Sequence, residues 1–226
     1  MIFRDRVDAG QQLARVFLER FPSLQREDPI VLAIPRGGVV VGREVAHALG
    51  APLDVFIARK LGAPGHEELG IGAVAPGGAR VLDTSTIRML GVPDEYIEDV
   101  TRRELAELNR RLKLFRGDRP PPRLADRAVA LVDDGLATGV TARAAVHALR
   151  AENPSKLIFA APVCSPEGRD LVAQEADYVL CVATPERFYG VGAWYADFRQ
   201  TSDDEVRELL ADQKPLGHVS GGSPSS

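Results

Sequence analysis

The chain has 226 residues, of which 45% are hydrophobic and 27% are charged, and its formal net charge is −4. This length and composition support one sizeable hydrophobic core with at most a small appendage. The weak negative charge argues against a general nucleic-acid or membrane surface, so any anion binding must be local.

The first residues carry charges where a signal peptide needs an apolar region, and no apolar run approaches the roughly 18 residues of a membrane span. The two cysteines, Cys164 and Cys181, form no CxxC pair, and no histidines cluster at metal-ligand spacing. We therefore expect a soluble, cytoplasmic protein with reduced cysteines and no structural zinc.

Short apolar runs rich in Val, Ile and Leu alternate along the chain with helical patterns, which is the order of βαβ units. We expect an α/β protein of the doubly wound type, with a mainly parallel sheet whose strands are buried on both faces. Strands are predicted at residues 30–34, 53–58, 129–132, 157–163 and 178–182. Helices are predicted at residues 38–49, 93–115, 141–150, 166–175 and 203–210, several of them closing on glycine or asparagine.

Three segments interrupt this alternation. Residues 61–92 hold many glycines and are predicted to form an excursion, a hairpin with mobile ends. Prolines at 120–122 exclude helix and indicate a stiff connector. Residues 214–226 are rich in Gly, Ser and Pro and are predicted to be a disordered tail, which leaves residues 1–213 as a single domain.

The strongest local signal lies where an apolar strand ends in Asp133 and Asp134 and a loop of small residues leads into the next helix. Backbone N–H groups, the hydroxyls of Thr138 and Thr141 and a helix N-terminus together suit a phosphate dianion. Carboxylates at the carboxyl end of a strand stand where open α/β sheets bind ligands, and they accept hydrogen bonds from sugar hydroxyls. A simple turn would explain an isolated Asp-Gly, but not all of these features together.

Residues 132–141, with the sequence VDDGLATGVT, resemble the phosphoribosyl pyrophosphate signature of type I phosphoribosyltransferases. The resemblance implies the fold of that family, with Asp133 and Asp134 contacting the ribose hydroxyls and acting in catalysis. It also implies that the 5-phosphate is held by the loop formed by Gly135, Leu136, Ala137, Thr138, Gly139, Val140 and Thr141.

A second anion site is predicted at the end of the first strand. Gly37 and Gly38 expose N–H groups at a helix start, and Arg36 is suited to donating in a fork to a phosphate. The segment resembles the pyrophosphate loop of the family, in which a cis peptide is expected near Arg36 and Gly37. Taken alone, an ordinary turn with a solvated arginine explains this segment equally well.

The second strand leads into Arg59 and Lys60, which resemble the start of the mobile catalytic loop of orotate and adenine phosphoribosyltransferases. This resemblance implies that Lys60 stabilises the departing pyrophosphate and that Arg59 or His66 assists when the loop closes. Solvated surface charges are the alternative explanation for these three residues.

Aromatic residues concentrate near the C-terminus, in residues 184–200, among them Trp194, Tyr195 and Phe198. In the family a small hood of terminal segments meets the acceptor base, and an aromatic face stacks well on a planar base. A small core that packs the C-terminal helix onto the sheet would explain the same residues.

The resemblance implies transfer of ribose-5-phosphate from phosphoribosyl pyrophosphate to a nitrogenous base or similar acceptor, as in nucleotide salvage. Mg²⁺ is expected to be held by the substrate, with water bridging it to Asp133 or Asp134, because the chain has no ligand cluster. A non-catalytic regulator of the same fold that binds phosphoribosyl pyrophosphate or a nucleotide is the alternative, although no nucleic-acid-binding motif is evident. Family members are often homodimers, and the sequence does not identify the acceptor.

Overall fold

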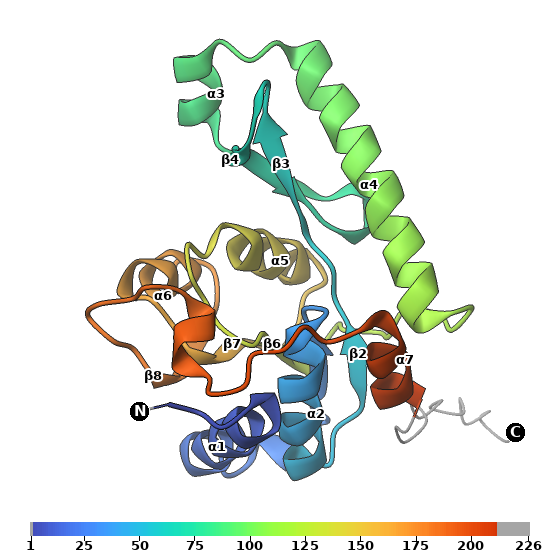
Figure 1. Cartoon of the computed structure of the whole chain (residues 1–226). Helices are drawn as coiled ribbons and strands as arrows, with labels where there is room; N and C mark the ends of the chain where they lie inside the picture. Colours follow the sequence, from blue (N-terminus) through green and yellow to red (C-terminus); the bar gives the residue numbers. More distant parts are fainter. Residues whose placement is uncertain (1, 212–226) are drawn as a thin grey trace, which may run out of the picture.

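The computed structural model describes residues 2–211, except for the side chains of Glu67 and Glu68. Its centre is a five-stranded sheet in the order β2-β1-β6-β7-β8, in which every neighbouring pair is parallel (Figure 1). The strands are β1 (Ile30–Ala33), β2 (Leu53–Val55), β6 (Ala128–Val132), β7 (Lys156–Val163) and β8 (Tyr178–Ala183). All five lie within a few residues of the ranges predicted from the apolar runs.

Helices cover both faces of this sheet because its strands bury side chains in both directions. Along β1, Ile30 and Leu32 pack into one apolar cluster, whereas Val31 packs into the other. One face is covered by α1 (Arg6–Arg20), α2 (Gly37–Leu49) and α7 (Asp203–Ala211), and the other by α5 (Val140–Ala151) and α6 (Pro166–Val172). This arrangement confirms the predicted α/β, doubly wound architecture.

Helix ends follow the predicted signals. The left-handed backbone conformation that glycine tolerates ends α2 at Gly50, with a φ of 63°. Asn153 has a φ of 54° just after α5. The apolar patterns did not single out α1, yet Leu13, Ala14 and Phe17 lie on one face of it and are buried against the core. The sequence of α1 is mostly polar and its buried stripe is narrow, so its apolar pattern was too weak to predict the helix.

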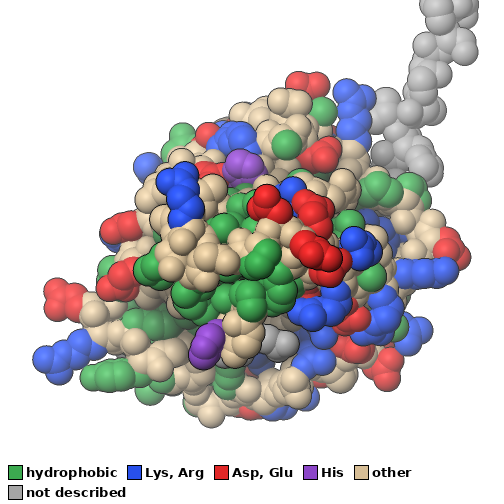
Figure 2. All heavy atoms as spheres, turned by 90° about the horizontal axis from the view of Figure 1, so that it is seen from above, with side chains coloured by type: hydrophobic (Ala, Val, Ile, Leu, Met, Phe, Trp, Pro, Cys, Tyr) green, Lys and Arg blue, Asp and Glu red, His purple; other side chains and the backbone are tan. Residues whose placement is uncertain are grey.

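The predicted excursion forms a second, antiparallel sheet of β3 (Arg59–Ala63), β4 (His66–Val74) and β5 (Arg80–Leu82), followed by α3 (Thr84–Leu90). The amino-terminal half of α4 (Asp94–Arg116) packs on this sheet through Ile97 and Val100, and its other half reaches the main core through Leu108. The excursion is therefore a packed arm, with a hairpin as its first part (Figure 1). Figure 2 views the molecule from the side of this arm, and acidic and basic side chains lie interspersed there.

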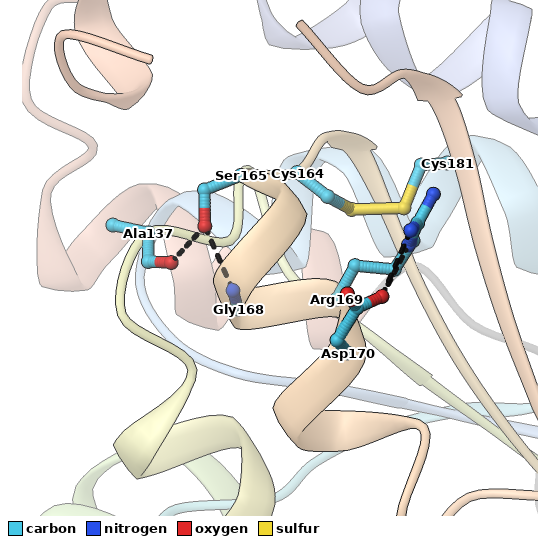
Figure 3. Close-up of a disulfide and its surroundings, with 7 residues drawn as sticks. All are labelled: Ala137, Cys164, Ser165, Gly168, Arg169, Asp170 and Cys181. Carbon is cyan, nitrogen blue, oxygen red and sulfur yellow. Dashed lines mark hydrogen bonds and ion pairs between the residues drawn. A yellow bond between two sulfur atoms is a disulfide. The ribbon is translucent and has the colours of Figure 1, made fainter. Parts of the chain in front are cut away.

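The expectation of two reduced cysteines was wrong. Cys164 and Cys181 form a disulfide, with their α-carbons 6.1 Å apart, because Cys164 directly follows β7 and Cys181 lies in the neighbouring parallel strand β8 (Figure 3). Their separation of 17 residues contains a whole helix, so no local spacing rule detects the pair.

Short 3-10 helices occur at Leu24–Arg26, Pro76–Gly78 and Val191–Trp194. Across residues 2–211, each helix is too short or too polar to cross a membrane. The predicted tail at 214–226 lies outside the described residues, and the mobility predicted for the ends of the excursion stays a prediction.

Candidate active site

Two predicted loops meet at one edge of the main sheet because β1 and β6 are parallel neighbours whose carboxyl ends lie together. The Ile34 N–H donates to the Val132 carbonyl at 2.9 Å, which aligns the ends of the two strands. Beyond them, a β-carbon at Gly38 would lie only 3.0 Å from the Asp133 α-carbon. Glycine therefore allows the start of α2 to lie directly against the acidic pair.

The acidic pair itself is held by backbone contacts. The Asp133 carboxylate accepts the Asp134 N–H at 2.8 Å, and the Asp133 N–H donates to the Ala160 carbonyl at 3.0 Å. Burial and the neighbouring Asp134 charge raise the pKa of Asp133 well above its ordinary value, and the Arg6 guanidinium partly opposes this. The pair is a set of preorganised acceptors with one strongly perturbed carboxyl group.

Arg6, in the first turn of α1, completes this pair and was not predicted. Its Nε donates to Asp134 Oδ2 at 2.7 Å, and its Nη1 donates to the Arg199 carbonyl at 2.7 Å. The guanidinium carbon lies 4.0 Å from the centre of the Phe198 ring. The exposed fractions of the Arg6 and Asp134 side chains are 11% and 17%, so the ion pair is largely shielded from solvent.

The predicted phosphate loop rests on the corner between β7 and α6 (Figure 3). Leu136 is buried and donates its N–H to the Val163 carbonyl at 2.8 Å, while the Ser165 hydroxyl donates to the Ala137 carbonyl at 2.5 Å. The same hydroxyl caps α6 by accepting the Gly168 N–H at 2.9 Å. These contacts hold the loop from below and leave Thr138 exposed above it.

The loop ends at Gly139, whose φ of 78° turns the chain into α5. The first turn of α5 therefore begins inside the predicted motif, and Thr141 is partly exposed there. Backbone N–H groups at such a helix start favour an anion. The buried Leu136 side chain anchors the loop.

The predicted pyrophosphate loop contains a cis peptide between Pro35 and Arg36, as the family resemblance implied. A β-carbon at Gly37 would overlap the carboxylate of Asp134. Arg36 directly precedes α2, and its Nη1 lies 3.4 Å from Oδ1 of Asp203 in α7, with about a quarter of its side chain exposed. The loop and the acidic pair thus form one contiguous surface.

The predicted catalytic-loop residues separate in the structure. The Lys60 side chain lies next to Gly70, close to the start of α5. A β-carbon at Gly70 would be 3.4 Å from the aliphatic part of Lys60 and 3.7 Å from Val140 of α5. Arg59 instead donates twice to Glu104 of α4, at 2.7 and 2.9 Å. His66 pairs with Ala63 at the opposite end of the hairpin from Arg59. Lys60 is the member of this set that lies beside the phosphate loop.

The three aromatic residues predicted for the hood differ in how deeply they are buried. Tyr195 is 6% exposed, packs 5.4 Å from the Phe3 ring and donates its hydroxyl to the Asp134 carbonyl at 2.5 Å. Trp194 belongs to the same small core, and its carbonyl accepts the Phe3 N–H at 2.8 Å. Phe198 is 38% exposed and lies over Arg6. Of the three predicted hood aromatics, Phe198 is the most exposed.

A family model described as "Phosphoribosyl transferase domain" matches residues 5–193. The chain belongs to this family. "Putative phosphoribosyl transferase Rv0571c" of Mycobacterium tuberculosis is 45% identical over 212 residues, covering 92% of this chain and 46% of that protein. The chain thus spans about half the length of the curated relatives it matches.

Among solved structures, TT1426 from Thermus thermophilus superposes on this phosphoribosyl transferase domain with a TM-score of 0.81 and 41% identity. The match covers 93% of this chain and 98% of that one. The AQ2163 protein from Aquifex aeolicus has a TM-score of 0.51 at 14% identity and covers 83% of this chain and 78% of its own, a likeness of fold.

Metal binding by this phosphoribosyl transferase domain would depend on few protein ligands. Within residues 2–211, no three His, Cys, Asp or Glu side chains gather as a metal cage. The acidic pair supplies two carboxylates, one of which already binds Arg6. Such a donor set fits a divalent ion held mainly by a substrate's phosphates, as hard cations with retained waters often are.

Proposed function

We propose that this phosphoribosyl transferase domain transfers ribose-5-phosphate from phosphoribosyl pyrophosphate to a nitrogenous base or a similar acceptor, with release of pyrophosphate. The observation that carries the proposal is the position of the acidic pair between two loops that are predicted to bind anions. Asp133 and Asp134 lie next to Gly37 and Gly38 on one side and continue into the loop before α5 on the other.

This order matches the chemical order of the donor molecule. A 5-phosphate in the loop that ends at Gly139 would face the N-terminus of α5, and ribose hydroxyls would reach the acidic pair. The pyrophosphate would then lie over Gly37 and Gly38, near Arg36. One ligand with phosphate groups at both ends of a diol satisfies all three parts.

In the proposed reaction, an acceptor nitrogen forms a bond to the anomeric carbon while the bond from that carbon to the pyrophosphate oxygen breaks. Positive charge develops on the ribose ring and negative charge on the leaving group. Asp133 and Asp134 orient the ribose and stabilise the positive charge, and Arg36 and Lys60 stabilise the pyrophosphate. Mg²⁺ bound to the substrate would neutralise further charge on the leaving group.

We assign the acceptor to the side of the site where Phe198 is partly exposed. Its ring packs against Arg6, which binds Asp134, and 38% of the residue is exposed, so we assign the contact with a planar heterocycle to its open part. The arm carries Lys60, which lies near Val140 at the start of α5. An acceptor that enters between the two would be screened from water, which otherwise competes as a nucleophile.

The test is the double substitution Asp133→Asn with Asp134→Asn, which keeps side-chain volume and removes both charges. We expect calorimetry to show binding of Mg²⁺-phosphoribosyl pyrophosphate by the unchanged protein and its loss in the variant, while the melting transition is retained. Equal affinity in both proteins would overturn the proposal. Pyrophosphate release with a panel of bases then tests turnover, and donor binding with no release across the panel would instead favour a regulator.

A further inference from the structure

We propose that Arg6 is a positioning residue that holds the Asp134 carboxylate in place and couples the donor site to the hood. This inference rests on the proposed function, because it assigns Arg6 a task in binding the donor. Arg6 lies outside every motif that the sequence singles out, and the packing of α1 on α2 helps to bring it to the site.

On the donor side, Arg6 contacts the Asp134 carboxylate, which lies against Gly37 of the predicted pyrophosphate loop. The Nε atom donates to Asp134 Oδ2 at 2.7 Å. A β-carbon placed on Gly37 would lie 2.5 Å from that Nε and would also overlap the carboxylate. The ion pair is thus wedged against the predicted pyrophosphate loop. Rotation of the Asp134 side chain away from this position would break its bond to Arg6.

On the hood side, the same guanidinium makes two further contacts. Its Nη1 donates to the Arg199 carbonyl at 2.7 Å, and its central carbon lies over the Phe198 ring, 4.0 Å from the ring centre. A planar guanidinium can make these contacts and the carboxylate contact at once, which a lysine ammonium cannot. Arg6 is therefore clamped between the acidic pair and the hood.

The backbone around Arg6 strengthens this connection. The Ala196 N–H donates to the Phe3 carbonyl and the Asp197 N–H donates to the Arg4 carbonyl, both at 2.8 Å. The N-terminal segment and the hood therefore form one unit that ends at Arg6. The Tyr195 hydroxyl also donates to the Asp134 carbonyl. Asp134 is therefore held at its side chain by Arg6 and at its backbone by the hood.

An ordinary surface ion pair would contribute little, because solvent screens it. The Arg6 and Asp134 side chains are only 11% and 17% exposed, and removal of one partner leaves the other as an uncompensated charge. A ribose that hydrogen-bonds to Asp134 would change the bond between Asp134 and Arg6. Because Arg6 packs on Phe198, the packing of Phe198 would change as well. Donor binding and hood position are coupled in this way.

The experiment compares unchanged protein with Arg6→Gln, Arg6→Lys and the control Arg4→Gln, which removes a neighbouring arginine whose exposed side chain pairs with Asp8. Donor affinity is measured by calorimetry with Mg²⁺-phosphoribosyl pyrophosphate. The hood is followed by the fluorescence of Trp194, the only tryptophan in the chain. Melting curves report folding in each protein.

For Arg6→Gln we expect donor affinity to fall on the order of tenfold or more, since a charge-assisted hydrogen bond is lost. The change in Trp194 emission at saturating donor should disappear. Arg6→Lys should recover most of the affinity but not the emission change, and Arg4→Gln should match the unchanged protein in both.

Arg6→Gln or Arg6→Lys behaving like the unchanged protein in both measurements would overturn the inference, as would an emission that donor binding never alters. If the unchanged protein binds no donor at all, the proposed function fails first. The two failures are therefore distinguishable, because the second is seen before any variant is compared.

Discussion

The α-carbon of Gly37 lies so close to the Asp134 carboxylate that no side-chain atom fits between them. A Gly37→Ala substitution must therefore displace the carboxylate, Arg6 or the start of α2. We expect kcat/KM to fall on the order of a hundredfold, the loss that a small misplacement of a positioned group causes. Steady-state kinetics with the donor varied would measure it.

The matched control is Gly50→Ala at the end of α2, where the φ of 63° makes a β-carbon unfavourable but the surroundings are open. It should cost roughly 1 kcal/mol of stability and leave kcat/KM unchanged. If both alanine variants lost activity equally, general destabilisation would explain the Gly37 result.

Asp133→Asn should stabilise the fold at neutral pH. The pKa of Asp133 is raised in the folded protein by burial and by Asp134, so folding favours its protonated form. The stability associated with this group is present below its unfolded pKa and is lost as the pH rises through the folded pKa. The variant should therefore exceed the unchanged protein in urea midpoint at pH 7, and the difference should shrink towards pH 4.

A constant difference between the two midpoints across that pH range would contradict the raised pKa. Because the same substitution removes an acceptor for the ribose, we expect weaker donor binding together with the gain in stability. Such an opposition between stability and activity is common at functional sites.

Ser165→Ala should weaken the predicted phosphate loop. Its hydroxyl joins the Ala137 carbonyl to the Gly168 N–H, so one substitution removes a loop contact and the cap of α6. We expect a stability loss of about 1 kcal/mol and a lower affinity for Mg²⁺-phosphoribosyl pyrophosphate in calorimetry. Asp83→Ala is the control, since Asp83 caps α3 in the arm, away from the loop. A fall in donor affinity of the same size in both variants would argue against the loop explanation.

Reduction of the Cys164–Cys181 disulfide should lower stability by about 3 kcal/mol, as expected for opening a closed loop of this length. Urea unfolding with and without reductant measures the difference. The Cys164→Ser, Cys181→Ser double variant should show one midpoint under both conditions. Free thiols detected in the non-reduced folded protein would contradict the pairing.

Local patterns in the chain were sufficient for the main sheet. The run 128–132 is apolar throughout, as strands buried on both faces are, and the alternation of such runs with helical patterns predicted the parallel sheet. The acidic loop from Asp133 to Thr141 was equally local, because strand, carboxylates, loop and helix start occupy consecutive residues. The cis peptide before Arg36 followed from the family resemblance.

The sequence by itself therefore determined those features whose residues all lie within a short continuous segment, such as an apolar strand or the loop that follows it. Tertiary structure decided the contacts between distant stretches: Arg6 with Asp134 is a pair 128 residues apart, and Cys164 meets Cys181 across neighbouring strands. It also decided that Tyr195 packs inward while Phe198 stays exposed. The physical reason is that hydrogen bonds, disulfides and burial depend on distance in space, and packing of the helices on the sheet sets those distances.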